Sequence, residues 1–449
     1  MEASLYAERD GSRATTATAV AVRAAVAGVA YIVALWVSYY YGGGFGQEAT
    51  IWLASGVAIG VLAAASTSRW LAYSIGLAIG AVVANLIAGE GIVASIVYAI
   101  EEIVVALLIA WALKRWLGES FRLDRVRNVL VFVAVGAVGG ALLSWLVNLA
   151  VYPPLGLPSP LLAWRLWIVS GTVGTLIVTP LILAWADFRP KRSGGATMAD
   201  FAWGAPLFIL LVLSTFFVFH GETSDRFSGS VGFTITYLPF VFLVLGGLIW
   251  GPRGATLSTF VLAAIAVVYT VRAQGPFAGV EGFLGEAVLE VQGYVAAAAL
   301  MSLLVSALTA SRQLALRDAA NWKTRYEAAI VASGQALYEL DPASGRLSWA
   351  GDTERLGFAG QNPSTLAGYL ERVHSSDRER VRSAFVALAR GTLRHSPLAH
   401  RLRSATGEDV RVEGDASAIV DFDDSVHRVV GFLRPLHVAS ELPAEARTT

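Results

Sequence analysis

The chain contains no cysteine among its 449 residues. This absence excludes disulfides, thiolate metal ligands and cysteine nucleophiles. Charge is also scarce: 15% of the residues are charged, and 34 basic residues balance 34 acidic ones. A chain without a net basic charge lacks the electrostatic field on which nucleic-acid binding depends. We therefore predict no nucleic-acid partner.

Apolar residues, in contrast, make up 55% of the chain, and the mean hydropathy is +0.58. A bilayer span needs about 20 mostly apolar residues. After a polar N-terminal tail at 1–16, residues 17–310 hold ten candidate spans, of which the second and third are short enough to form one broken element: 17–41, 49–66, 70–88, 91–113, 129–151, 161–186, 201–219, 231–250, 254–272 and 285–310. The sequence therefore predicts a polytopic all-α membrane bundle of about ten spans in a lipid bilayer.

The basic residues are distributed unevenly between the loops. With the N-terminus inside, the inner loops carry ten of them: Arg69, Lys114, Arg115, Arg122, Arg125, Arg127, Arg189, Lys191, Arg192 and Arg253. The outer segments carry only Arg165, Arg226 and Arg272. Cytoplasmic loops are enriched in Lys and Arg. The bias predicts that both termini are cytoplasmic.

Several ionisable or polar residues interrupt the apolar runs. They are Glu101 and Glu102 with Tyr98 one turn earlier, and Glu286, Glu290 and Gln292 at the start of the last span. Such groups are costly at bilayer depth and are functional candidates by default. We expect these six residues to line a polar cavity for an unknown small-molecule ligand or protons. Structural alternatives stay open: an interhelix hydrogen bond for the first pair, and a water-exposed position for Glu286.

Four stretches of the membrane block resemble the membrane-associated sensor domain called MASE, in its first subfamily. The matching residues are Trp52, Ser55 and Gly56; Gly174, Thr179 and Pro180; Gly251, Arg253, Gly254, Ala255, Gly275, Pro276 and Phe277; and Gln292. The resemblance covers residues 20–310. It implies a sensory domain of the bacterial inner membrane, of the kind found at the N-termini of sensor histidine kinases and diguanylate cyclases. Many of these motif residues also suit turns and helix packing, so they are not automatically ligand contacts.

The last span runs on past the membrane without Pro or Gly, which predicts one continuous helix with a coupling section at 311–330. Leu308, Ala315, Trp322 and Tyr326 recur in it at steps of four or seven residues. This period is typical of an apolar helix seam. We expect the helix to relay a signal, with its seam in a homodimer.

Residues 331–437 predict a cytoplasmic α+β domain: a two-stranded hairpin, then helices, with Asp377 capping the longest, then three strands at 396–404, 410–420 and 427–438. This order resembles a PAS domain. The matching residues are Gly357, Val373, His374, Asp377, Arg401, Arg403, Thr406, Gly407 and Gly431. PAS domains bind small molecules or relay and dimerise. The remaining tail, 438–449, is predicted to be disordered.

The soluble domain offers no case for a cofactor or a catalytic site. His374 is a lone helical histidine, and His395, His400 and His427 lack metal-ligand spacing. Without cysteine, flavin chemistry through a thiol adduct is excluded. The sequence also shows no ATP-binding loop, phosphorylatable histidine pair or cyclase motif. We therefore predict no cofactor, no metal site and no enzymatic activity in this chain.

These features together predict an integral membrane signal-transduction sensor of a two-component type, which relays an unknown stimulus to its PAS domain. Its kinase or cyclase output module is absent from the chain, which predicts either a truncated gene product or a separate output protein as partner. Two other interpretations remain. The membrane block is a transporter regulated by the PAS domain, or it is only an anchor for a PAS relay.

Overall fold

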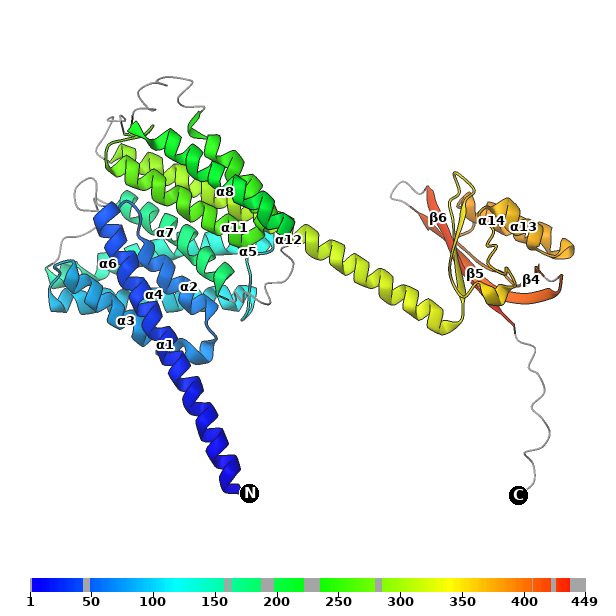
Figure 1. Cartoon of the computed structure of the whole chain (residues 1–449), viewed down its shortest axis with the longest axis horizontal. Helices are drawn as coiled ribbons and strands as arrows, with labels where there is room; N and C mark the ends of the chain where they lie inside the picture. The colour runs from blue at the N-terminus through cyan, green and yellow to red at the C-terminus, as the bar shows by residue number, and fades with distance from the viewer. Residues whose placement is uncertain are drawn as a thin grey trace. The chain divides into compact units, whose positions relative to one another are not determined.

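The structure is a computed structural model, and it describes residues 2–42, 49–156, 161, 164–186, 198–221, 235–278, 285–405, 407–420 and 425–436. The chain divides into two compact units, Met1–Leu314 and Ala315–Thr449. The first is helical and the second contains the sheet (Figure 1). Thr406 and the predicted tail at 438–449 lie outside the described residues.

The membrane unit is built from long apolar helices, shown in blue to green in Figure 1. Its α-helices are α1 (Glu2–Gly42), α2 (Leu53–Ala64), α3 (Trp70–Ile87), α4 (Ile92–Leu117), α5 (Val126–Val131), α6 (Gly140–Val151), α7 (Trp164–Trp185), α8 (Met198–Phe219), α11 (Leu238–Val271) and α12 (Glu286–Ser333). Shorter elements are η1 (Thr67–Arg69), the π-helical η2 (Phe132–Gly139) and η3 (Pro153–Leu155). α1 already begins at Glu2, so residues 2–16 of the predicted polar tail are helical. Apolar side chains cover the outside of the bundle, as a hydrocarbon environment requires: Val22, Val26, Val29 and Val33 of α1 are each more than half exposed.

Eight helices in the described part of the chain are long and apolar enough to cross a membrane, where the sequence predicts about ten spans. The first difference is α2, whose 12 residues are too few for a span. The second is α11, which counts as one helix of 34 residues but is interrupted at Gly251 (φ 62°, ψ −153°). A Cβ added to Gly247 would lie 3.5 Å from the Cβ of Ala255. In a straight helix these positions are about 12 Å apart, so α11 folds back as a hairpin of two helices.

Glycines let neighbouring helices approach closely. A Cβ on Gly28 of α1 would lie 2.5 Å from the carbonyl oxygen of Gly76 in α3. Between α2 and α7, a Cβ on Gly56 would lie 2.6 Å from the carbonyl oxygen of Gly174. Small residues at contacts are the usual means of packing helices in lipid, where no hydrophobic effect drives association. These contacts hold α1 closely against α3, and α2 closely against α7.

α12 is a single helix of 48 residues. It starts at the last apolar run of the membrane unit and ends directly before the first strand of the second unit. Its sequence contains no Pro, and Gly293 is its only glycine, so the backbone has few reasons to break. The predicted continuous helix through residues 311–330 is therefore present.

The second unit is an α+β domain with an antiparallel sheet in the order β2-β1-β6-β5-β3, and with β4 also paired to β5. Its elements are β1 (Ala336–Leu340), β2 (Leu347–Gly351), η4 (Glu354–Leu356), α13 (Leu366–Arg372), α14 (Ser375–Ala389), β3 (His395–Pro397), β4 (His400–Arg403), β5 (Asp409–Val420) and β6 (Val426–Pro435). α14 packs on β3, β4, β5 and β6. The predicted order of hairpin, helices and three strands is confirmed, except that the first of the three strands is divided into β3 and β4.

The residues that carry the PAS resemblance hold the helices to the sheet. The prediction that Asp377 caps α14 is wrong. His374 caps the helix, and its Nδ1 accepts a hydrogen bond from the Ser376 N–H at 3.3 Å. Asp377 instead accepts from the backbone N–H of Arg401 at 3.1 Å and from its guanidinium at 3.0 Å. This contact holds the pKa of Asp377 below its usual range, because the guanidinium stabilises the charged carboxylate. The motif therefore has a structural role here.

Aromatic side chains fill the core of the PAS-like domain. Tyr338, Phe358, Tyr369 and Phe385 are each 1% exposed or less. His400 lies among them, 5% exposed, with its Nε2 2.6 Å from the Tyr369 hydroxyl oxygen. Burial lowers the pKa of His400 to about 4, and the nearby Arg380 contributes in the same direction.

His400 should make the stability of this domain depend on pH. Below pH 6.5 the unfolded chain binds a proton that the folded domain refuses until about pH 4, so the free energy of unfolding falls through this window. The expected loss is about 2–3 kcal/mol. Urea unfolding of residues 315–449 at pH 7.5 and pH 5 measures it. His400→Leu should remove most of the loss, whereas His427→Leu, at an exposed position, should retain it. Equal pH dependence in wild type and His400→Leu would contradict the assignment.

Candidate functional site

Two adjacent carboxylates, Glu101 and Glu102, lie in α4 inside the membrane unit, with 9% and 8% of each residue exposed. Successive residues of a helix project about 100° apart, so the two side chains meet different neighbours. A carboxylate at bilayer depth is costly unless partners hold it. Among the described residues those partners are two serine hydroxyls and the Trp52 indole, and no basic side chain pairs with either carboxylate.

The Glu101 carboxylate faces α6. The Ser144 hydroxyl donates to it at 2.8 Å, and Asn148, one turn further along α6, donates from Nδ2 to the Ser144 oxygen at 3.5 Å. Asn148 is 1% exposed, and its Oδ1 has no hydrogen-bond partner among the described residues. The π-helical η2 directly precedes α6. Such wide turns are rare and are frequent at functional sites.

The Glu102 carboxylate faces α2. The side chains of Trp52 and Ser55, which belong to the Trp-x-x-Ser-Gly motif, make polar contacts with it. Tyr31 of α1 is 1% exposed and lies within electrostatic reach of both carboxylates. Side chains from four helices and one connection therefore converge, and we call them the acidic cluster: Tyr31, Trp52, Ser55, Glu101, Glu102, Ser144 and Asn148.

Tyr98 lies at the edge of this cluster rather than within it. It is half-buried, and its ring centroid is 5.3 Å from that of Tyr152 at the end of α6. Tyr152 in turn meets Trp167 of α7 at 6.3 Å. The three aromatic rings therefore pack in a row beside the carboxylates.

The acidic cluster consists almost entirely of hydrogen-bond acceptors and hydroxyl groups. Two carboxylates, a free amide oxygen and two serine oxygens lie together without a balancing cation. Buried negative charge needs a partner or a proton. The arrangement therefore suits a bound proton or a positively charged group. Within the described residues no set of three or more His, Asp or Glu side chains is placed to hold a metal ion.

The three residues predicted on α12 separate from one another. Gln292 is fully buried, and its Nε2 donates to the Thr50 carbonyl oxygen at 2.5 Å. Glu290 is exposed and Glu286 is half-buried. The six predicted residues are thus not brought into one cavity. Glu101 and Glu102 lie together, Tyr98 borders them, and Gln292 approaches them through Thr50, two residues before Trp52.

The backbone between α1 and α2 joins these contacts, and we call residues 49–55 the connecting segment. Its Trp52 N–H donates to the Ser170 carbonyl oxygen at 3.2 Å, and the Ser170 hydroxyl donates to the Ala49 carbonyl oxygen at 2.9 Å. Its Leu53 N–H donates to the Ser38 hydroxyl at 3.0 Å. With the bond from Gln292, hydrogen bonds from α1, α7 and α12 hold this segment, while Trp52 and Ser55 reach the acidic cluster.

Several of the other motif residues serve packing and turns. The Thr179 hydroxyl donates to the Gly56 carbonyl oxygen at 2.9 Å, next to the close Gly56–Gly174 contact. Arg253 donates to the Ala184 carbonyl oxygen at 3.1 Å. Gly251 forms the turn of the α11 hairpin. These findings favour the structural interpretation of the motifs, with Trp52, Ser55 and Gln292 as the exceptions.

The four predicted coupling residues are all exposed on α12. Leu308, Trp322 and Tyr326 are 58%, 73% and 50% exposed, and Ala315 is exposed as well. Leu308, Ala315 and Trp322 follow one another at seven-residue steps on one side of the helix. Large apolar side chains at such spacing leave an unpaired apolar stripe on this chain.

The MASE1 family model matches residues 21–313. No curated protein matches the chain. Solved structures match its C-terminal part. They include a sensory box histidine kinase/response regulator from Burkholderia thailandensis E264, at 19% identity over 25% of this chain and 84% of that one, with a TM-score of 0.22. They also include the N-terminal domain of a diguanylate cyclase with PAS/PAC sensor from Marinobacter aquaeolei (16%, 22% and 94%, TM-score 0.21). A third is the PAS domain of a protein from Colwellia psychrerythraea (18%, 26% and 96%, TM-score 0.22).

Proposed function

Because the chain belongs to the MASE1 family, we propose that it is a signal-transduction sensor whose membrane unit detects a stimulus at the acidic cluster. The stimulus is a proton or a positively charged group, since the cluster offers acceptors and uncompensated carboxylates. The signal leaves through α12 and is received by the PAS-like domain. The protein is multi-pass; its MASE1 resemblance implies a bacterial inner membrane, and the loop charges favour a topology with both termini in the cytoplasm.

One observation carries this proposal: the connecting segment touches both the acidic cluster and α12. Trp52 and Ser55 contact Glu102, and Thr50 accepts the hydrogen bond from Gln292. A change of charge at Glu102 alters its contact with Trp52. The resulting shift of the backbone displaces Thr50, two residues away. Gln292 is buried in the first turns of α12. A shift of its partner, the Thr50 carbonyl group, therefore shifts the start of this helix.

The proposal for how the signal leaves the membrane unit depends on the exposed apolar stripe of α12. Seven-residue spacing is the period of a coiled coil, so the stripe fits a homodimer in which two α12 helices meet. Rotation or separation of the two helices then changes the relative placement of the PAS-like domains. A MASE1 and a PAS-like domain are identified in the chain, and we propose that a kinase or cyclase module receives the signal from them.

The acidic cluster can be tested in a fusion of residues 1–437 to a kinase or cyclase module of known activity. Glu102→Gln removes the negative charge with little change of shape, so output should lose its response across a panel of pH values and cationic metabolites. The response should fall at least fivefold. Glu290→Gln is the matched control, because Glu290 is exposed on α12, and it should respond as wild type does.

A response of Glu102→Gln equal to that of wild type would reject the cluster as the sensing site. A flat output in every variant would support the anchor interpretation instead. Substrate accumulation in vesicles that contain the unfused chain would favour the transporter interpretation.

The role of α12 predicts a dependence on helical phase. Each inserted residue rotates the rest of the helix by about 100°, so insertions of one to four alanines after Ala315 should change output periodically. Three or four added residues, which nearly complete a turn, should restore most of the activity that one or two remove. Output measured in the same fusion checks this, and a uniform loss that ignores phase would contradict it.

A further inference from the structure

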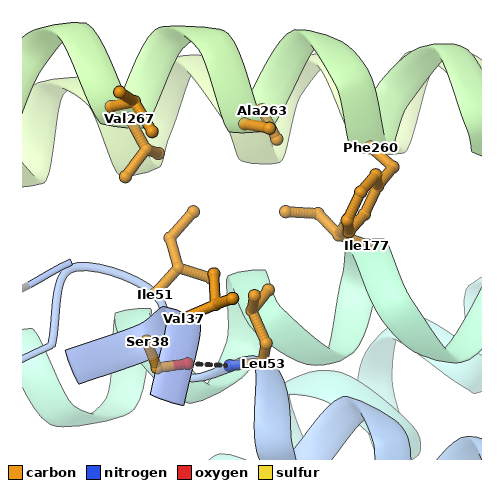
Figure 2. Close-up of a pocket in the computed structure, with 10 residues that line it drawn as sticks. Val37, Ser38, Ile51, Leu53, Ile177, Phe260, Ala263 and Val267 are labelled. Atoms are coloured by element: carbon orange, nitrogen blue, oxygen red, sulfur yellow. Dashed lines mark hydrogen bonds between the residues drawn. The ribbon is translucent and has the colours of Figure 1, made fainter. Parts of the chain in front are cut away.

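A second feature of the membrane unit is a pocket of about 250 Å³ that is distinct from the acidic cluster. Figure 2 shows Phe260, Ala263 and Val267 of α11 facing it from one side. Val37 and Ile51 face it from the other side, at the end of α1 and in the connecting segment. Ile177 of α7 and Leu53 of α2 complete the lining. The pocket therefore lies where α1, α2 and α7 meet α11.

The lining offers a ligand almost no hydrogen bonding. Nine of the ten lining residues are apolar, and the tenth is Ser38. The Ser38 hydroxyl donates to the Ala34 carbonyl oxygen at 2.8 Å and accepts from the Leu53 N–H at 3.0 Å. Its proton is thus already engaged. A polar group placed here would lose its hydrogen bonds to water without replacement, at a cost of about 1–3 kcal/mol or more. The pocket selects an apolar occupant.

The pocket opens toward the lipid-facing side of the bundle. Ala264 at its edge is exposed, and Val37 and Val268 are half-buried. α1 and the second helix of the α11 hairpin, residues 252–271, are long and apolar enough to span the bilayer, so the medium at this opening is hydrocarbon. Apolar cavities of about 150 Å³ already take up a benzene-sized molecule. A pocket of about 250 Å³ is large enough for a segment of an alkyl chain.

We propose that this pocket binds an acyl chain of a membrane phospholipid, which enters from the bilayer beside Ala264. Ile51 forms its inner wall, and Ile51 is 6% exposed between Thr50 and Trp52. An inserted chain therefore presses on the connecting segment next to the Gln292 contact. The site would make the membrane unit responsive to the lipid around it. This binding does not depend on the acidic cluster acting as a sensor.

The test uses the full chain in phosphatidylcholine vesicles that contain a small fraction of phospholipid with a diazirine in its acyl chain. After illumination, mass spectrometry locates the labelled peptides. The segment around Phe260–Val268 should be labelled at least threefold more densely than the segment around Ile79, which is 60% exposed in the middle of α3. Ala264→Phe should close the entrance and reduce this excess at least threefold. Ala25→Phe adds the same ring at an exposed position of α1 and should leave the excess unchanged.

Equal labelling of the two segments, or an excess that survives Ala264→Phe, would overturn the proposal. If Ala264→Phe does not yield folded protein, Ala264→Leu decides instead, with Ala25→Leu as its control and the same expected results. If free myristate, added at the same mole fraction as the labelled phospholipid, abolishes the excess at Phe260–Val268, the site takes fatty acids in preference to phospholipid, and the proposal fails.

Discussion

The hydrogen bond from Gln292 to the Thr50 carbonyl oxygen joins the last membrane helix to the connecting segment between α1 and α2. Ser38 and Ser170 hold the same few residues from α1 and α7. A backbone segment inside an apolar bundle must find partners for its polar groups, because lipid supplies none. These bonds therefore fix the segment in one place, between the acidic cluster and the apolar pocket.

The connecting segment has two faces with opposite chemistry. Trp52 and Ser55 meet the buried Glu102, whereas Ile51 borders an apolar pocket that opens to lipid. The buried carboxylate and the apolar pocket thus border adjacent residues, close to the Thr50 contact with Gln292 of α12. An unbroken helix of 48 residues, with no Pro and one Gly, is well suited to transmit a displacement of its first turns to a soluble domain. The PAS-like domain that follows it has a core of buried aromatic side chains.

The sequence predicted much of this architecture. Apolar runs placed most of the helices, and turn signals placed the strands of the α+β domain. The charges of Glu101 and Glu102 stood out in an apolar run. Their partners cannot be recognised in the sequence, because Ser144 and Tyr31 are ordinary residues for a membrane span. Only the packing of the helices shows that these side chains converge. The sequence also does not show how deep a residue lies in the bilayer or which side of a helix carries it. It therefore predicts Glu290 in one site with Glu101 and Glu102, although Glu290 is exposed. The α11 hairpin was predicted as two spans, and its turn rests on one glycine with a positive φ angle.

The central claim is that the acidic cluster and α12 are energetically coupled through the connecting segment. A double-mutant cycle between Glu102→Gln and Gln292→Leu, measured by thermal unfolding of the full chain in vesicles or detergent, tests it most directly. Coupled residues deviate from additivity by about 0.5–3 kcal/mol, whereas independent ones add to within about 0.5 kcal/mol. We predict a deviation in the coupled range, and additivity for the control pair of Glu290→Gln with Gln292→Leu. Additivity of Glu102→Gln with Gln292→Leu would contradict the account.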